Sequence, residues 1–522
     1  MHNASMGTQN LVGGAWLAEH YGVQLVMPLL VQSRVGGRRT TQVAQGITTQ
    51  TYVESMRPTN NLRGHLTFHL KHEVLHLELL WRAFGKIKVQ ELLDWVADEP
   101  SGQYAKRAGF LYEWLTEQEL AMKTSMAGSY VDVVDGQKQV AASETLALLN
   151  RRWRVRNNLA GTRAFCPLIQ KTPEALQAMA LDVPQLLQAL AAEFGQDVLM
   201  RSAVWMTLRE SKSSFAIEGE GDQLDRIQRF ADVLARRTGQ GVWPLDEASL
   251  AQLQSEILGP RVSLQQFGLR QSPVFVGEVV RFHEVVHYVG PPFEAMHAML
   301  EGLKVFLERT QGQSSVMRSA VAAFGFEYMH PLADGNGRVH RFLINDVLRR
   351  DGVVLAPMVL PVSSLISSHA ADRRAYDDIL DTVSGPLMRA ISGHYSFAPS
   401  NTAYADGIQS NFVFKGNEVA QPVWQYLNLT PHVVYLADVL ERTIREDMRE
   451  ESRFLRNHAQ ARSAIKAIVE MPDAQIDRVI RSVQANQGKL SNVLSTEIPL
   501  LTDPALWSAI VQAIKDSFND NG

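Results

Sequence analysis

The sequence predicts a mainly α-helical protein of several domains. With 522 residues, of which 45% are hydrophobic and 20% charged, the chain is long enough for roughly two to four domains with ordinary cores. Apolar residues recur with helical spacing over most of the chain, and stretches typical of strands are few and short. We expect an N-terminal mostly helical domain over residues 1–194, a central domain over 195–400 and a C-terminal helical domain over 401–522.

Charge and cysteine content exclude some classes of function. The net charge is −4, which gives no general attraction to nucleic acid or anionic membranes. Cys166 is the single cysteine, so an internal disulfide is ruled out and a reducing compartment is expected. The first residues do not resemble a secretory signal, and the apolar runs at 23–31 and 353–362 are too short to span a bilayer. We therefore expect a soluble, cytoplasmic protein with no membrane partner.

The N-terminal domain begins with a Gly- and Thr-rich stretch, residues 1–50, which predicts turns and short strands. Apolar spacing then changes to a helical pattern. Helices are expected over 62–96, 104–120, 174–194 and 197–211, with a short hairpin-like stretch over 128–142.

One helix of this domain carries the spacing of a zinc site. His72, Glu73 and His76 form an H-E-x-x-H sequence, in which the histidines bind zinc and the glutamate acts as general base. His65 and His69 extend the row along the same expected helix face. No third ligand is marked in the sequence, so a half-buried packing helix is the alternative to a zinc protease.

A basic segment with one aromatic residue, 151–156, also has two interpretations. Arginines alternate with Trp153 there, as in a patch that binds nucleic acid or an acidic partner. Six residues in a nearly neutral protein are also consistent with an ordinary solvated face, and we expect no nucleic-acid partner from this segment.

The central domain is predicted to contain a hairpin followed by three helices. Pro291-Pro292 ends the hairpin and starts the first helix. The third helix stops at Asp351-Gly352. The expected strands are 273–276 and 285–289, and the expected helices run to about 309, over 315–328 and over 338–350.

The loop between the second and third of these helices has the residues of a phosphate site with its own base. His330 can accept a proton from a hydroxyl, because imidazole titrates near neutral pH. Asp334 can hold Mg²⁺, which binds one or two carboxylates and phosphate oxygens. Gly335 and Gly337 let backbone N–H groups approach phosphates, and the arginines that follow fall on one helix face.

Residues 330–341, HPLADGNGRVHR, resemble the signature H-P-F-x-[DE]-G-N-G-R-x-x-R of the Fic family. Leu332 stands where the family usually has Phe, a residue that packs beneath the loop. A polar loop capping a helix would explain the glycines and Asn336. It would not explain a histidine, an aspartate and two arginines at matching offsets.

The resemblance implies a Fic-type helical core that moves AMP from Mg-ATP to a Ser, Thr or Tyr hydroxyl of a protein and releases pyrophosphate. His330 would then be the catalytic base and Asp334 the Mg²⁺ ligand. Nucleotide contacts would come from Gly335, Asn336, Gly337, Arg338 and Arg341, the last of which would bind the γ-phosphate.

An upstream segment resembles the family's inhibitory motif, [ST]-x-x-x-E-[GN]. Ser214 and Glu218 fall on one face of a helix expected near 205–219, and Gly219 can end that helix. The resemblance implies that Glu218 pairs with Arg341 and so keeps that arginine away from ATP. An exposed glutamate near a helix end is the alternative.

Two further site elements are implied only by the resemblance. Family members pin the target through a β-hairpin flap by strand pairing. The flap residues here would be Ser272, Val274, Phe275, Val276 and Gly277. Residues 372–377 resemble the family's N-R-x-x-Y-Y segment, which would place Tyr376 near the adenine. Asp377 replaces the second Tyr, and an ordinary helix-face aromatic is the alternative for Tyr376.

The C-terminal domain shows helical patterns over 431–457, 459–470 and 474–485. A further helix start near 490–493 would complete a helix–turn–helix, although no basic run supports base readout. Other classes of function stay open. The core could use another nucleotide, could remove AMP with Glu218 aligning water, or could serve as a regulatory binding module. The target protein is unknown, with the chain itself a candidate, and a homodimer is an open assembly.

Overall fold

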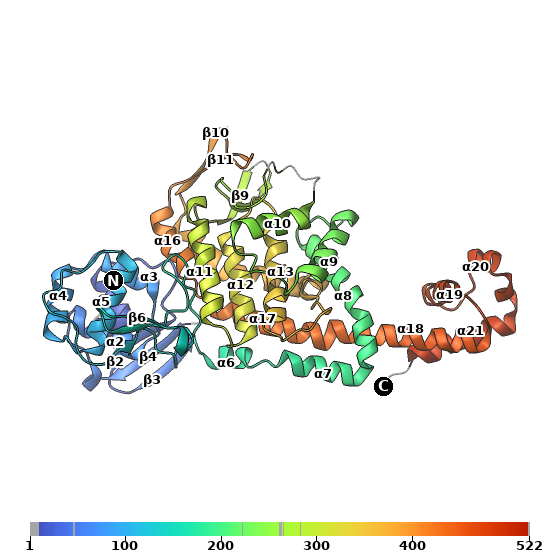
Figure 1. The fold of residues 1–522 in the computed structure, drawn as a ribbon, viewed down its shortest axis with the longest axis horizontal. Helices are drawn as coiled ribbons and strands as arrows, with labels where there is room; N and C mark the ends of the chain where they lie inside the picture. Colours follow the sequence, from blue (N-terminus) through green and yellow to red (C-terminus); the bar gives the residue numbers. More distant parts are fainter. Residues whose placement is uncertain are drawn as a thin grey trace, which may run out of the picture.

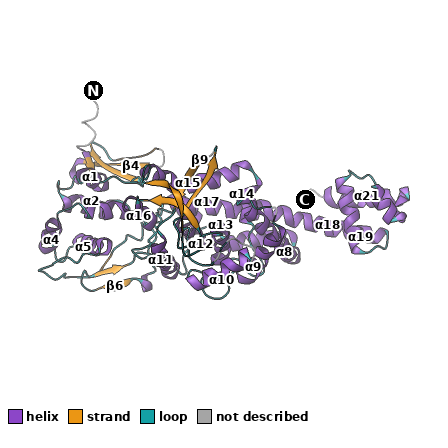
Figure 2. Ribbon diagram, turned by 90° about the horizontal axis from the view of Figure 1, so that it is seen from above, coloured by secondary structure: helices purple, strands orange, loops and turns teal. Residues whose placement is uncertain are grey.

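The computed structural model describes residues 10–44, 47–221, 223–259, 264, 266–281 and 283–519. Figure 1 shows three parts in a row: an N-terminal domain, a central helical body, and a small helical cluster at the end of the long helix α18. Helices dominate each part, so the predicted mainly α-helical class is confirmed. Figure 2 shows that strands occur in the N-terminal domain and in the neighbouring part of the central body.

The N-terminal domain combines five helices with two small sheets. The first sheet has the order β1-β2-β4-β3, and its β2 and β4 run parallel. In the second sheet β5 pairs in parallel with β7, so the hairpin predicted over 128–142 is wrong. The elements are β1 (Leu11–Val12), α1 (Gly13–His20), β2 (Val31–Gly36), β3 (Thr40–Ala44), β4 (Ile47–Val53), α2 (Leu62–His72), α3 (Leu77–Phe84), α4 (Val89–Asp98), α5 (Gln103–Thr116), β5 (Val131–Asp132), β6 (Leu148–Asn150) and β7 (Val155–Asn157).

The helical stretch predicted over 62–96 is confirmed and consists of three separate helices, α2, α3 and α4. The first break comes at Glu73, whose carboxylate turns back and accepts the backbone N–H of Gly14 at 2.8 Å. His76 then starts α3, since its ring accepts the backbone N–H of Leu79 at 3.1 Å in the manner of an N-cap. The side chains that a continuous helix would place on one face therefore point in different directions in this structure.

Five helices lead from the N-terminal domain into the central body. Gly195, with a φ of 89°, separates α7 from α8, because a left-handed residue cannot continue a helix. The long helix α8 then runs along the side of the body that faces the C-terminal cluster, as Figure 1 shows in green. These helices are α6 (Pro173–Met179), α7 (Val183–Phe194), α8 (Gln196–Ile217), α9 (Leu224–Arg237) and α10 (Glu247–Leu258).

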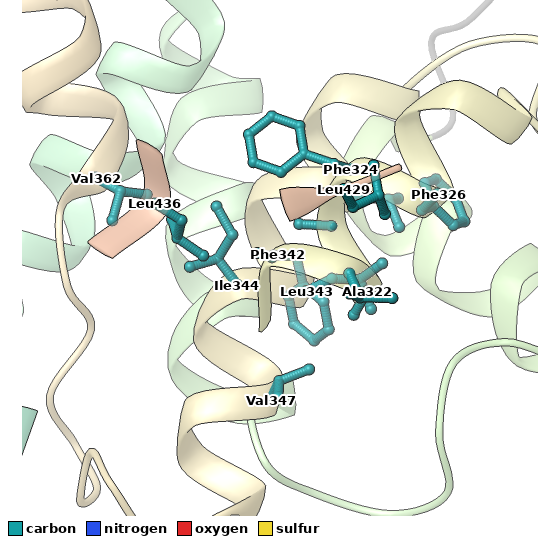
Figure 3. Close-up of a cluster of buried hydrophobic side chains, with 14 of the residues drawn as sticks. Ala322, Phe324, Phe326, Phe342, Leu343, Ile344, Val347, Val362, Leu429 and Leu436 are labelled. Carbon is teal, nitrogen blue, oxygen red and sulfur yellow. The ribbon is translucent and has the colours of Figure 1, made fainter. Parts of the chain in front are cut away.

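The core of the central body is built on the paired helices α12 (Ser315–Met329) and α13 (Asn336–Arg350), which confirms the two helices predicted there. Ser314 caps α12 by accepting the N–H of Met317 at 3.4 Å. Each large side chain buried in this core stabilises the fold by about 1.5–3 kcal/mol. Figure 3 shows part of the core, with Ala322, Phe324, Phe326, Phe342, Leu343, Ile344, Val347, Val362, Leu429 and Leu436.

Three more helices and two hairpins surround this pair. The helices are α11 (Met296–Arg309), α14 (Val362–Ser368) and α15 (Ala370–Ala390). Both hairpins are antiparallel, and they meet where Phe275 packs against Phe397 and Phe412. The strands are β8 (Phe275–Val280), β9 (His283–Val289), β10 (Tyr395–Ala403) and β11 (Gln409–Phe414). The predicted hairpin exists, with longer strands than its sequence suggests.

The central core continues beyond residue 400, which lies inside β10. Helices α16 (Asn417–Gln425) and α17 (Thr430–Arg442) bury side chains in the same core cluster. A π-helical segment, Thr443–Met448, joins α17 to α18 (Arg449–Ile468), so the break predicted between 457 and 459 is wrong. No Gly or Pro interrupts α18.

The helical cluster at the end of α18 has its own small hydrophobic core. Its helices are α19 (Asp473–Ala485), α20 (Asn492–Glu497) and α21 (Pro504–Asn519). The helix start predicted near 490–493 is therefore present. Among the described residues, no helix is long and apolar enough to span a membrane.

Candidate active site

The loop between α12 and α13 holds the residues of the predicted phosphate site in a rigid frame. His330 ends α12 in a left-handed conformation with a φ of 48°, and Gly335, with a φ of 92°, starts α13. The Asn336 amide spans the loop: its Oδ1 accepts the Leu332 N–H at 2.9 Å, and its Nδ2 donates to the Leu332 carbonyl at 2.8 Å. Leu332 is fully buried beneath the loop. Asn336 therefore shapes the loop instead of pointing freely at a ligand.

The imidazole of His330 is buried and uncharged at the end of α12. Its Nδ1 atom is buried without a hydrogen-bond partner among the described residues, 4.0 Å from Oε1 of Glu327. Burial, followed by the positive charge of Arg270, lowers the pKa of His330 to about 4. The imidazole is thus neutral near pH 7 and can accept a proton.

Arg341 is held by the end of α8. Its Nε donates to Oγ of Ser214 at 2.7 Å, and its Nη2 lies 2.5 Å from Oε1 of Glu218. Burial acts to raise the pKa of Glu218, but the guanidinium of Arg341 outweighs it and keeps that pKa below its usual value. Gly219, with a φ of 75°, turns the chain away directly after this contact. The structure thus brings together all four residues of the predicted inhibitory contact.

The Glu218 carboxylate also covers the N-terminus of α13. A Cβ atom added at Gly337 would overlap Oε1 of Glu218, so the carboxylate lies directly against the backbone there. A helix N-terminus attracts anions through its unpaired N–H groups and its dipole. Glu218 therefore occupies the place that the sequence assigns to phosphate oxygens.

Arg338 contacts a second carboxylate from the same segment. Its Nη1 lies 2.5 Å from Oε2 of Glu220, and its Nη2 donates to Oδ1 of Asp334 at 2.8 Å. The guanidinium carbon sits 4.8 Å from the ring centroid of Phe215 on α8. Each arginine of the loop is thus paired with its own glutamate, Arg341 with Glu218 and Arg338 with Glu220.

The comparisons with known proteins agree with this geometry. Residues 244–348, from α10 to near the end of α13, match the sequence model of the Fic/DOC family. This part of the chain is a Fic domain.

Two curated proteins, both described as protein adenylyltransferase fic-1, are similar to this chain. The Caenorhabditis briggsae protein is 27% identical over 124 residues, which cover 23% of this chain and 22% of that protein. The Caenorhabditis elegans protein is 28% identical over 134 residues, with 24% of each covered. The similarity thus spans less than a quarter of these relatives' length. A crystal structure of a Fic family protein from Desulfovibrio desulfuricans G20 aligns with 62% of this chain and 90% of its own, at 19% identity and a TM-score of 0.39.

The predicted flap residues lie at the start of the β8–β9 hairpin of the Fic domain. Ser272 and Val274 precede β8, whereas Phe275, Val276 and Gly277 are within it, with a bulge between the last two. The Ser272 hydroxyl donates to Asp406 at 2.7 Å, which ties the hairpin to the loop between β10 and β11. Val276 is exposed, so the hairpin offers side chains and an edge to solvent.

Tyr376 lies in the core beside the Fic site. It is buried on α15, with its ring centroid 6.2 Å from His340 and 6.4 Å from Tyr435. Burial raises the pKa of its hydroxyl well above the usual value. Contact between Tyr376 and an adenine stays a prediction, and it would require the packing around this ring to open.

The two other sequence patterns lie in the N-terminal domain. His72 ends α2 and His76 caps α3, while Glu73 is buried against Gly14 and His69. No group of three or more potential metal ligands is found in the described part of the chain. In the segment 151–156, Trp153 is fully buried and donates to Glu113 at 2.6 Å, so it cannot stack on a base.

Sequence reasoning missed three residues of the site: Glu220, Arg270 and Glu327. Each acts on a loop residue without belonging to a local motif. Helical spacing could have predicted Glu327, because it lies one helical turn before His330 and so faces the same side. Arg270 and Glu220 reach the loop from 60 and 118 positions away, and no sequence spacing indicates them.

Proposed function

We propose that this protein transfers AMP from Mg-ATP to a Ser, Thr or Tyr hydroxyl of a protein, and that the structure is its inhibited state. The observation that carries the proposal is the position of a neutral His330 at the mouth of a loop whose following helix presents Arg338 and Arg341. The curated relatives' printed name, protein adenylyltransferase, favours the same chemistry.

In this reaction the hydroxyl oxygen attacks the α-phosphorus of ATP. A new oxygen–phosphorus bond forms, the bond from the α-phosphorus to the bridging oxygen breaks, and pyrophosphate leaves. His330 takes the hydroxyl proton as the bond forms. The N-terminus of α13 and Arg338 stabilise the negative charge that develops on the phosphate oxygens.

The residues present fit a magnesium ion at Asp334. One of its carboxylate oxygens accepts a bond from Arg338, and 38% of the side chain is exposed at the edge of the site. A single carboxylate of this kind is a usual protein share of a Mg²⁺ shell that phosphates complete. When bound, the ion neutralises phosphate charge and orients the triphosphate.

Inhibition follows from the pairing of both loop arginines with glutamates. Glu218 covers the N-terminus of α13 and pairs with Arg341. The γ-phosphate of ATP can then bind neither the Arg341 guanidinium nor the N–H groups at the start of α13. Glu220 holds Arg338 in the same way. Release of the segment 218–220 would free both arginines together.

The acceptor is a protein, and a second copy of this chain is one candidate. The exposed edge of the β8–β9 hairpin could pair with an extended acceptor segment. Cys166 is buried and free, which fits a cytoplasmic location.

Labelled nucleotides test the proposal. The Glu218→Gly protein, incubated with Mg²⁺ and ATP labelled on the α-phosphate, should acquire label and a mass increase of one AMP, whereas γ-labelled ATP should leave it unlabelled. His330→Ala in the same background should abolish labelling with an unchanged thermal unfolding midpoint. Labelling from the γ-phosphate, labelling that survives His330→Ala, or loss of AMP from a modified protein without any gain would each reject the proposed transfer.

A further inference from the structure

Arg270 lies at a junction between the catalytic loop and the flap hairpin. It belongs to the segment that leads into β8, and only 2% of its surface is exposed. Its guanidinium donates to three backbone carbonyls: Nε to His330 at 2.7 Å, Nη1 to Ser272 at 2.8 Å and Nη2 to Pro291 at 2.5 Å. Its own backbone N–H donates to the Pro331 carbonyl at 2.9 Å.

These contacts join three parts of the site. Ser272 comes before β8 and Pro291 follows β9, so the two carbonyls mark both ends of the hairpin. His330 is the base of the proposed reaction, held in a left-handed conformation that is unfavourable for a residue with a side chain. Gly290 shows how closely the parts approach, because a Cβ there would lie 3.5 Å from Nη2 of Arg270 and 3.7 Å from Cβ of His330.

The charge of Arg270 is poorly compensated for a buried group. Among the described residues, it has no carboxylate oxygen within 4.0 Å, and its hydrogen bonds to protein oxygen all go to carbonyls. Burial lowers the pKa of Arg270 to about 10, so it is still a cation at neutral pH. Asp406 and Glu294 stabilise its charge only from beyond contact distance. A buried cation without a carboxylate in contact is costly for stability, and such groups gather at functional sites.

We propose that Arg270 is a positioning residue, which locks the backbone of His330 to both ends of the β8–β9 hairpin and so sets the distance between the base and an acceptor segment on the flap. The inference rests on the proposed transfer to a protein hydroxyl. Lysine cannot replace it, because one ammonium group cannot span three carbonyls in fixed directions.

The same contact places a positive charge beside the imidazole. Three ionisable groups face His330: Arg270 from the segment before the flap, Glu327 from α12 and Glu218 from the end of α8. Arg270 opposes protonation of the imidazole, whereas the backbone of Glu327 and the carboxylate of Glu218 favour it. Removing the charge of Arg270 should therefore raise the pH at which His330 titrates. A change that keeps the positive charge but breaks the three carbonyl contacts should leave that pH unchanged.

A pair of variants separates geometry from charge, both made in the Glu218→Gly background. Arg270→Lys keeps the cation and loses the three-way contact, so kcat should fall about 10- to 100-fold, with KM for ATP within about twofold. Arg270→Gln should show the same loss of kcat. Its His330 should also titrate at higher pH by NMR, with His330→Ala used to assign the signal. Arg309→Lys is the matched control, because Arg309, at the end of α11, also donates to backbone carbonyls, those of Leu159 and Gly161 at 2.8 and 3.1 Å.

Hydrogen exchange gives a readout that does not depend on transfer. In wild type the Gly290 N–H bonds to the Val274 carbonyl at 3.1 Å across the hairpin ends. Arg270→Lys should raise exchange there at least about tenfold while α12 and α13 stay protected. A kcat within twofold of the background, or unchanged exchange and His330 titration, would overturn the positioning role. If the background protein itself transfers no AMP, the proposed function fails, and Arg270 is judged on exchange and titration alone.

Discussion

Glu218 meets Arg341 at 2.5 Å, and Ser214, one helical turn earlier on α8, accepts a second bond from the same guanidinium at 2.7 Å. Arg341 is fully buried by these contacts. Three of its five N–H donors already have partners, because Nη2 also donates to the Ser214 carbonyl at 3.3 Å. In the proposed reaction, ATP would therefore have to displace Glu218 from Arg341.

Glu218→Gly should strengthen ATP binding. The change removes a charge-assisted bond worth about 1.5–3 kcal/mol, which corresponds to roughly a 10- to 100-fold gain in affinity. Calorimetric titration with a non-hydrolysable ATP analogue measures it. Ser214→Ala loses one neutral acceptor and should give a smaller gain in the same direction. Equal affinities in the wild-type and Glu218→Gly proteins would contradict the inhibitory pairing.

Glu220→Gln should activate the enzyme separately, through Arg338. Glu220 shares Arg338 with Asp334, so removing its charge should have a smaller effect than removing that of Glu218, roughly a two- to fivefold rise in initial rate. Asp225→Asn, a matched change at an exposed residue in the first turn of α9, should have no effect. In the double variant Glu218→Gly/Glu220→Gln the gains should be less than multiplicative, because both residues leave with one segment. Fully multiplicative gains would show that they act independently.

The contrast between Glu218 and Glu220 shows how far the sequence alone reaches. His330, Asp334 and both arginines could be assigned because they lie within one short segment whose spacing carries the chemistry. Glu218 was found through its motif, but Glu220 lies two residues further with no motif of its own. Its role depends on the turn at Gly219, which points both glutamates at one helix.

The H-E-x-x-H sequence shows the opposite case, in which a motif matches in sequence but its local structure favours the packing alternative over a zinc site. The zinc interpretation requires a continuous helix, whereas tertiary bonds to Glu73 and the capping role of His76 end α2 and begin α3. We expect EDTA to leave the thermal unfolding midpoint within about 1 °C, since the described residues contain no group of three potential metal ligands that could hold a structural metal. Metal analysis of the purified protein is the check, and stoichiometric zinc whose removal lowers the midpoint would contradict it.

Arg318 should be a main support of the catalytic helices. It is buried on α12, and its Nε and Nη2 bind the two carboxylate oxygens of Asp351 after α13 at 2.8 and 3.1 Å. Arg318→Ala leaves Asp351 without its partner, so the free energy of unfolding should fall by about 3–5 kcal/mol. Arg445→Ala, which breaks the exposed pair with Glu441, should cost under about 1 kcal/mol. Denaturant unfolding of both variants compares them, and similar losses would refute the assignment.

Glu210 should make the docking of α8 sensitive to pH. It is fully buried, and its carboxylate accepts the backbone N–H and the hydroxyl of Ser363 at 2.7 and 2.6 Å, which ties α8 to the start of α14. Burial raises the pKa of Glu210 to about 7, although the bonds from Ser363 act to lower it. The folded protein therefore binds this proton more tightly than the unfolded chain does.

Its contribution to stability is then complete below about pH 4.5 and is lost as the pH rises through about 7. The loss is on the order of 3 kcal/mol, because the folded pKa lies roughly 2.5 above the ordinary value of 4.5 and each pH unit is worth about 1.36 kcal/mol. Urea unfolding at pH 5, 6, 7 and 8 should show stability falling with pH in the wild type and falling less in Glu210→Gln, which keeps groups able to bond Ser363. Part of the slope should survive in that variant, because burial also raises the pKa of Glu327 to about 7. If the free energy of unfolding changes with pH by the same amount in the two proteins, Glu210 is ionised in the folded state at all these pH values. The docking of α8 would then not depend on a proton on Glu210.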